Sequence, residues 1–391
     1  MMKTYFAKQL FDGQKMHTNM HMSVNNGKIS HIETSQKSQF TADAQLNGLV
    51  CAGFIDTQVN GGGGVLFNYE QSPTALSKMM QGHAKFGTTA MLPTLITDSP
   101  DKMFKAANAV ADAIAESIPG IVGIHYEGPH LSQAKKGIHP SSHVRTVSDS
   151  DLATFTRPDI GKVMVTLAPE NVPNDVIKDL VKQGVVVSLG HSGATIDQAL
   201  AAIDAGATCS THLFNAMSGL TAREPGLISA ALSDARIFSG LIADLHHVHP
   251  QNCMLAYQCI GAERLMLVTD AMAHVGSDLQ TLPWLDSSIT KVGDKLILDD
   301  GSLAGSCLDM TSAVRNMLNL LQIRISTASR TNILADTLKM ASQVPANLLG
   351  LDGYGELAVG KRADFVLLDN KIYTQACWIS GKQISGEEPE A

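Results

Sequence analysis

Two consecutive strand–helix units between residues 185 and 215 constrain the fold of this chain more than any other feature. An apolar, β-branched run from Val185 to Leu189 leads into His191, the pattern of a buried strand that delivers a histidine at its C-terminal end. After a helical stretch, a second short strand, Thr208–Thr211, leads into His212 in the same way. Because the C-terminal ends of parallel strands share one edge of a sheet, the two imidazoles are expected to lie close together.

Each histidine taken alone is equally consistent with an ordinary hydrogen-bonded residue at a strand end. Two histidines in phase on successive strands favour a metal or catalytic pair. The C-terminal edge of the strands is where α/β barrels build their active sites.

The chain between residues 53 and 270 repeats this alternation. The strand candidates are Gly53–Gln58, Thr89–Leu95, Ile121–Glu127, Val163–Leu167, Val185–His191, Thr208–His212, Phe238–Asp244 and Leu265–Asp270. These eight strands, separated by helical stretches, predict an α/β fold of the (β/α)₈ TIM-barrel type. An open, doubly wound sheet is the alternative, but no GxGxxG follows the first strand to support it.

Helices are expected where apolar residues recur at helical period or where Ser-Pro marks a helix start. The expected helices begin at Ser72-Pro73 and Ser99-Pro100 or span Val176–Gln183, Ile196–Ala205, Leu227–Ser233, Asn252–Ile260, Ser312–Gln322 and Ile333–Leu349. A β-like insertion, Thr290–Leu298, is expected between the eighth strand and the last two helices.

Both ends of the chain have the character of short strands joined by turns. Asn26-Gly27 is a strong hairpin signal near the N-terminus, and the apolar run Ala363–Leu368 is followed by a turn near Gly381. Two β-rich ends around an α/β middle predict that the termini form one small β-sandwich domain. The predicted boundaries are residues 1–52 and 353–391 for this domain and 53–352 for the barrel.

Charge and composition narrow the class of partner. The chain has 391 residues, a net charge of −8 and no Lys/Arg block, which argues against a nucleic-acid surface. An anionic substrate must therefore be held by local groups. The six cysteines lack CxxC spacing, the N-terminus has no apolar signal core, and no apolar run could span a bilayer. We therefore expect a cytoplasmic enzyme without a membrane partner.

The last residues of the strands form a constellation with metal and proton-transfer chemistry. Glu127, His191 and His212 supply a carboxylate and two imidazoles, which with one open position is the ligand set of a catalytic zinc-type site. A divalent ion there would activate water near neutral pH. Asp270, at the end of the eighth strand, could take the proton of the water and pass it to a leaving nitrogen.

Other interpretations of these residues remain open from the sequence. Glu127 precedes Gly-Pro and could be a salt-bridged loop residue, and Asp270 could cap the helix that follows. The run that contains Asp244, His246, His247 and His249 could bind metal itself or lie at a solvated strand end. A substrate-polarising role for His247 is favoured over both.

Six stretches resemble the amidohydrolase superfamily and, within it, the N-acetylglucosamine-6-phosphate deacetylase family. They are residues 53–61 (GFIDTQVNG), 125–129 (HYEGP), 189–192 (LGHS), 211–217 (THLFNAM), 267–272 (LVTDAM) and 303–306 (LAGS). With residues 360–364 (GKRAD), the resemblance spans nearly the whole chain. HxEGP and THLFNAM together are specific to this family, whereas the terminal motifs mark only the superfamily.

The resemblance also implies how many metal ions the chain binds and which residues bind them. Superfamily members often carry His-x-His after the first strand for a second ion, but here the positions are Gln58 and Asn60, and amides are poor zinc ligands. The implied cofactor is one divalent ion per chain, with zinc first and Fe, Co or Mn as alternatives. Its implied ligands are Glu127, His191 and His212.

The resemblance also assigns roles around the metal. It implies that Asp270 is the acid–base and that His247 polarises the acetyl carbonyl. Its implied sugar-phosphate contacts are His139, Asn215, Ala216 and Arg223, with the backbone of Leu303, Ala304 and Gly305 closing over the substrate. Similar enzymes are homodimers in which such an arginine can reach the partner's site.

The implied activity is hydrolysis of N-acetylglucosamine 6-phosphate to glucosamine 6-phosphate and acetate. The alternative is another amide hydrolase of the superfamily, an N-acyl-amino-acid deacylase or a cyclic amidase. One departure from the family is Leu245, which stands where the family usually has Gly after Ile-Ala-Asp. Its side chain is expected to shift His247 or narrow the pocket.

Overall fold

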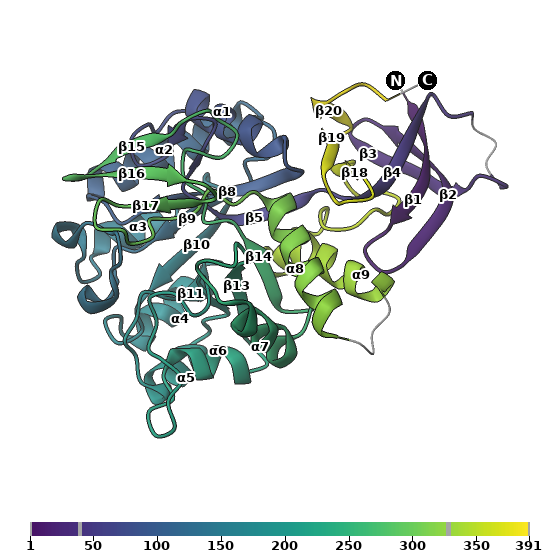
Figure 1. Ribbon diagram of the computed structural model, residues 1–391. Helices are drawn as coiled ribbons and strands as arrows, with labels where there is room; N and C mark the ends of the chain where they lie inside the picture. Colours follow the sequence, from purple (N-terminus) through teal and green to yellow (C-terminus); the bar gives the residue numbers. More distant parts are fainter. Residues whose placement is uncertain (1, 38–40, 326–329, 390–391) are drawn as a thin grey trace.

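The computed structural model describes residues 2–37, 41–325 and 330–389 (Figure 1). Its centre is an eight-stranded parallel sheet in the order β14-β13-β12-β11-β10-β9-β8-β5. The strands are β5 (Phe54–Val59), β8 (Thr88–Ile96), β9 (Gly123–Glu127), β10 (Lys162–Leu167), β11 (Val186–Leu189), β12 (Cys209–Ser210), β13 (Phe238–Ile242) and β14 (Leu265–Val268).

The two edge strands of this sheet meet, so the sheet closes into a barrel. The amide of Asp270, just after β14, donates to the carbonyl of Gln58 in β5 at 3.0 Å, and Gly61 donates to Ala271 at 2.9 Å. The predicted (β/α)₈ barrel is thereby confirmed. Each predicted strand is present, although the structure shortens the two expected to end in His191 and His212 by three residues each.

Helices cover the outside of the barrel. They are α1 (Pro73–Ala84), α2 (Pro100–Ala115), α3 (Asp149–Phe155), α4 (Asn174–Lys182), α5 (Ile196–Asp204), α6 (Leu227–Ser233), α7 (Pro250–Ile260), α8 (Met310–Arg324), α9 (Arg330–Ala341) and α10 (Gln343–Leu349). The Ser-Pro signals are true N-caps, because the hydroxyls of Ser72 and Ser99 accept from the backbone amide three residues on. The short helix α3, which begins with a capping box at Ser148, was not expected from the sequence.

The helix predicted over residues 333–349 is wrong as a single element, since the structure divides it into α9 and α10 at Ser342. Pro345 has no amide hydrogen and cannot continue a helix that began before residue 341, but it fits the first turn of a new one. Ser342 has non-helical dihedral angles, and its hydroxyl donates to the Leu338 carbonyl at 2.7 Å.

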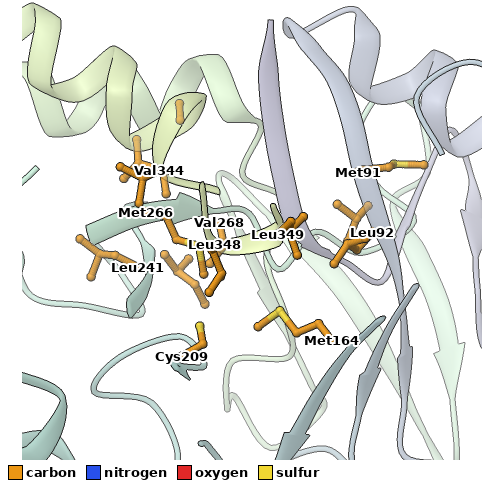
Figure 2. Close-up of a cluster of buried hydrophobic side chains, with 14 of the residues drawn as sticks. Met91, Leu92, Met164, Cys209, Leu241, Met266, Val268, Val344, Leu348 and Leu349 are labelled. Carbon is orange, nitrogen blue, oxygen red and sulfur yellow. The ribbon is translucent and has the colours of Figure 1, made fainter. Parts of the chain in front are cut away.

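The short helix α10 packs against the barrel core. Figure 2 shows its Val344, Leu348 and Leu349 beside Met266 and Val268 of β14. Further core side chains in this view are Met91, Leu92, Met164, Cys209 and Leu241.

The two chain termini share one seven-stranded sheet, in the order β20-β19-β18-β4-β1-β2-β3. Its strands are β1 (Lys3–Phe11), β2 (Met16–Asn25), β3 (Lys28–Thr34), β4 (Ala44–Ala52), β18 (Phe365–Leu368), β19 (Thr374–Ile379) and β20 (Lys382–Gly386). The sheet curls around its own core, where Trp378 stacks on Phe365 and lies 6.0 Å from the ring of Tyr5. Figure 1 shows this unit beside the barrel. The boundaries given above for the two units stay a prediction.

A three-stranded antiparallel insertion follows the eighth barrel strand. It consists of β15 (Thr281–Trp284), β16 (Ser287–Val292) and β17 (Lys295–Ile297), so it begins earlier than the expected Thr290. Its apolar face, including Trp284 and Ile289, packs on Met272 and Leu66 beside the barrel. A minimal hairpin of β6 (Gly61–Gly62) and β7 (Val65–Leu66) follows β5. None of the described helices has the length and apolarity needed to cross a membrane.

Candidate active site

Glu127, His191 and His212 converge at the C-terminal edge of the barrel. Glu127 ends β9, and the two histidines follow β11 and β12. The Oε1 atom of Glu127 lies 3.2 Å from Nε2 of His191 and 3.0 Å from Nε2 of His212, and the two Nε2 atoms are 3.0 Å apart. All three side chains are buried, with 3–5% exposed.

The hydrogen bonds of these residues fit a cation. Nδ1 of His191 lies 2.8 Å from the carbonyl of Lys135 and must donate to it, which leaves Nε2 facing Glu127 and His212. The facing imidazoles outweigh the effect of burial and hold the pKa of Glu127 well below its usual range. A carboxylate and two imidazoles that converge in this way are suitable ligands for one divalent ion.

A third imidazole, that of His139, lies beside this group. The hydroxyl of Thr97 donates to the carbonyl of Glu127 at 3.0 Å and therefore accepts from Nδ1 of His139 at 2.9 Å. This leaves Nε2 of His139 as an acceptor, 3.6 Å from Oε2 of Glu127. Burial and the neighbouring His191 lower the pKa of His139 well below its usual value, so the ring is neutral. Ligand atoms of Glu127, His139 and His191 all lie within 4.8 Å of one another.

Asp270 is held by two side-chain amides from β5 and the residue after it. Its Oδ1 accepts from Nδ2 of Asn60 at 2.7 Å and from Nε2 of Gln58 at 3.1 Å, and the same Gln58 nitrogen donates to Glu127 at 2.9 Å. Gln58 thus donates to both carboxylates, and Asn60 donates to Asp270 alone. Burial and the nearby Glu127 carboxylate raise the pKa of Asp270 to about 6, which suits a base near neutral pH.

The histidines that follow β13 point to three different partners. Nδ1 of His247 lies 2.5 Å from the Asp244 carboxylate, Nε2 of His246 lies 2.9 Å from that of Asp294, and His249 caps α7. They do not gather into a metal site of their own. Only His247 among them lines the pocket beside Glu127.

A cavity of about 200 Å³ lies over these groups. Its lining residues are Asn60, Ile96, Glu127, Gly137, Ile138, His139, His191, His212, Asn215, Ala216, Ile242, His247, Asp270, Leu303 and Gly305.

Two of the residues expected to contact substrate are not among those that line the cavity. Ala304 is fully buried in the core under the insertion, while its neighbours Leu303 and Gly305 reach the cavity. Arg223 is exposed in the loop between β12 and α6 and does not line the cavity in this chain. The glycines after β5 pack on protein, since a Cβ on Gly61 would lie 2.4 Å from the Val65 carbonyl.

The backbone at the rim is left-handed at several residues that carry the site. The φ angles are 48° at His191, 29° at His212, 65° at Leu245 and 53° at Asp270. Non-glycine residues rarely adopt this conformation, and it is concentrated at functional sites in proteins.

Sequence reasoning missed the groups that orient the histidines. Thr97 follows β8 in a loop, and Lys135 ends a single 3₁₀ turn, Gln133–Lys135, that no sequence pattern announced. Asp244 was noticed as part of a polar run, but its bond to His247 was not expected. The Asp-x-x-His spacing was the available signal.

Comparison with known proteins identifies the family of this chain. Residues 49–387 match the amidohydrolase family. An N-acetylgalactosamine-6-phosphate deacetylase of Shewanella sp. (strain ANA-3) is 45% identical over 365 residues, covering 92% of this chain and 90% of the relative. An N-acetylglucosamine-6-phosphate deacetylase of Haemophilus influenzae is 33% identical over 364 residues, covering 90% of each. The crystal structure of N-acetylglucosamine-6-phosphate deacetylase from Pasteurella multocida superposes with a TM-score of 0.91 at 31% identity, over 98% of this chain and 99% of that one. The chain therefore belongs to the amidohydrolase family.

Proposed function

We propose that this protein is a metal-dependent deacetylase of an N-acetylhexosamine 6-phosphate. The observation that carries the proposal is the convergence of Glu127, His191 and His212 beside Asp270 in one pocket. The expected substrate is N-acetylglucosamine 6-phosphate. Its galactosamine epimer is a second candidate, because the relative at 45% identity is named for that sugar.

Glu127, His191 and His212 hold one divalent ion in this proposal, with zinc first and Fe, Co or Mn as alternatives. When bound, the ion polarises the acetyl carbonyl and activates water. Gln58 donates a side-chain amide hydrogen to Glu127, and Asn60 donates one to Asp270. Other superfamily members carry a second pair of metal ligands at these two positions. This supports a single ion per chain.

The side chains of the pocket carry the proton and the developing charge. Asp270 takes a proton from water and returns it to the departing nitrogen, since an amide anion would be a very poor leaving group. His247 donates to the acetyl oxygen as it becomes negative, which is the role of an oxyanion-hole donor. The lone pair on Nε2 of His139 suits a sugar hydroxyl, and we assign the sugar phosphate to Asn215 and Ala216, which line the same cavity.

The phosphate requires a cation that this chain does not bring to its own pocket, since no lysine or arginine is among the described lining residues. We propose that Arg223 of a second copy supplies it in a homodimer, because Arg223 stands on an exposed loop with Leu220, which is 54% exposed. A planar guanidinium is suited to bind phosphate with two parallel hydrogen bonds. We place this reaction in the cytoplasm.

The test is release of acetate from the two N-acetylhexosamine 6-phosphates and from their unphosphorylated sugars. We expect activity only on the phosphorylated compounds, loss of activity with a chelator and recovery with Zn²⁺. Activity on N-acyl amino acids or cyclic amides without phosphate would instead favour the alternative hydrolase. The ratio of kcat/KM for the two epimers decides between the two sugars.

A further inference from the structure

Asp244 is a buried carboxylate beside the pocket to which the proposed reaction gives no role. It lies two residues after β13, and its side chain is 7% exposed. Its Oδ1 accepts from the backbone amides of His246 at 2.9 Å and His247 at 2.8 Å, and its Oδ2 lies 2.5 Å from Nδ1 of His247. Both carboxylate oxygens are therefore bonded to the loop that carries His247.

We propose that Asp244 is a positioning residue for deacetylation, which binds the Nδ1–H of His247 and keeps Nε2 available to the pocket. The inference rests on the proposed function, in which His247 donates a hydrogen bond to the acetyl oxygen of the substrate. In an imidazole the two nitrogens face different directions, so fixing one fixes the other.

The pair also has the correct charge for this work. With the Nδ1 proton committed to Asp244, the ring donates from Nε2 only when both nitrogens carry protons, and the carboxylate supplies the compensating charge. Burial would raise the pKa of Asp244, but the hydrogen bonds from His247 and from the backbone outweigh it and lower the pKa. Asp244 is thus an anion at neutral pH.

The backbone around Asp244 is arranged to make these bonds. Leu245 has a φ of 65°, which turns the chain so that two successive amides face one carboxylate oxygen. Before the turn, the Ala243 carbonyl accepts from Nδ2 of Asn316 in α8 at 3.0 Å. His247 is consequently oriented by the protein itself, as preorganised electrostatic stabilisation requires.

The adjacent His246 offers a matched control. It pairs with Asp294 at 2.9 Å, but Asp294 is 82% exposed at the turn between β16 and β17, and neither residue lines the cavity. The same carboxylate-to-amide substitution can therefore be made at two neighbouring Asp–His pairs, of which only one touches the pocket.

The experiment compares Asp244→Asn, Asp294→Asn, His247→Gln and the double variant Asp244→Asn/His247→Gln on the N-acetylhexosamine 6-phosphate that the wild type prefers. We expect Asp244→Asn to lower kcat about 10²–10³-fold, the loss typical of one oxyanion donor, with metal content and KM unchanged. Asp294→Asn should match the wild type in both constants. The double variant should be no slower than His247→Gln, because both changes remove the same interaction.

A proton NMR spectrum provides a readout independent of turnover. The wild type should show a downfield resonance from the hydrogen-bonded Nδ1–H of His247, absent from His247→Gln and from Asp244→Asn. Lack of this resonance in the wild type would overturn the proposal even if the Asp244 variant failed to fold. Wild-type kcat in Asp244→Asn, or a double variant slower by the product of the single losses, would also overturn it. A wild type that releases no acetate from either epimer would instead overturn the proposed function.

Discussion

At the residue scale, the rim of the barrel holds its functional side chains on strained backbone. His191, His212 and Asp270 all have positive φ, which turns each residue sharply as it leaves its strand. A left-handed conformation costs a non-glycine residue roughly 1–2 kcal/mol, and here it aims the side chains across the barrel mouth.

Leu245 allows this cost to be measured. Its side chain is half-buried at a φ of 65°. Leu245→Gly and Leu245→Ala both remove the packing of the leucine side chain, but only the glycine variant also removes the steric strain of a positive φ. We therefore expect the Gly variant to be more stable than the Ala variant by about 1 kcal/mol in urea unfolding. The reverse order, which is normal at most positions, would show that the turn is not strained.

Asp270 carries the proton in the proposed reaction, so Asp270→Asn tests the central step. The variant keeps the size of the side chain but cannot accept a proton, and we expect kcat to fall at least about 10²–10⁴-fold with metal content retained. Since the pKa of Asp270 is raised to about 6 and the base works only when deprotonated, wild-type kcat/KM should fall as the pH drops through this region. A bound cation would move this limb to lower pH.

In Asp270→Asn the low-pH limb should disappear from any residual activity. Metal analysis provides the control. A metal-free Asp270→Asn protein would make Asp270 a ligand, and a nearly fully active one would remove it from the mechanism.

At the scale of elements, the strands and their functional ends were predictable, whereas the connections were not. Apolar runs before Glu127, His191, His212 and Asp270 mark buried strands, and parallel strands must bring their ends to one edge. The insertion was only half recognised because Thr281–Trp284 is short, contains a proline and depends on tertiary packing of Trp284.

The helix break at Ser342 was missed for a related reason. Helical periodicity continues across it, and the termination comes from local chemistry at Ser342 and Pro345. Likewise, nothing in the local sequence indicated that the Lys135 carbonyl would orient His191.

The helix α10 that follows this break stabilises the barrel. Leu349 is 3% exposed against the barrel core, so Leu349→Ala should lower the free energy of unfolding by about 2–5 kcal/mol. Val359→Ala, at a side chain 61% exposed, is the control and should cost less than about 0.5 kcal/mol. The kcat of the folded Leu349 variant should match the wild type, because α10 contributes no residue to the cavity.

At the scale of the whole molecule, a buried carboxyl lies at the seam where the barrel closes. Asp56 of β5 accepts from the Thr269 hydroxyl at 2.5 Å across the seam with β14, and burial raises the pKa of Asp56 to about 7 despite this bond. Between the unfolded value near 4 and about 7, the folded state holds a proton that the unfolded state has released. This group therefore makes stability fall as the pH rises through that window.

Asp56→Asn should remove this dependence, since the amide does not ionise. The Tm of the variant relative to the wild type should become more favourable from pH 5 to pH 8. A constant difference across this range would mean that Asp56 does not titrate in the folded protein.

The last prediction concerns the proposed dimer, in which each active site is built from residues of two chains. Arg223 is exposed and far enough from its own cavity not to line it. Arg223→Ala should therefore reduce kcat/KM for the phosphorylated sugar by about 10-fold or more, the range for losing a charged hydrogen bond to a ligand, and leave metal content unchanged.

Complementation distinguishes a shared site from a self-contained one. An Arg223→Ala chain has intact metal ligands, and a His191→Ala chain has an intact arginine, so each homodimer is inactive or weak. In a mixed dimer, one of the two sites combines the wild-type His191 of one chain with the wild-type Arg223 of the other. We expect activity to rise when the two variants exchange subunits, toward one working site per mixed dimer, whereas mixing either variant with itself gives no increase. Proven subunit exchange without recovered activity would place the phosphate contact of Arg223 within its own chain, and equal proportional loss on phosphorylated and unphosphorylated sugars would give Arg223 a structural role instead.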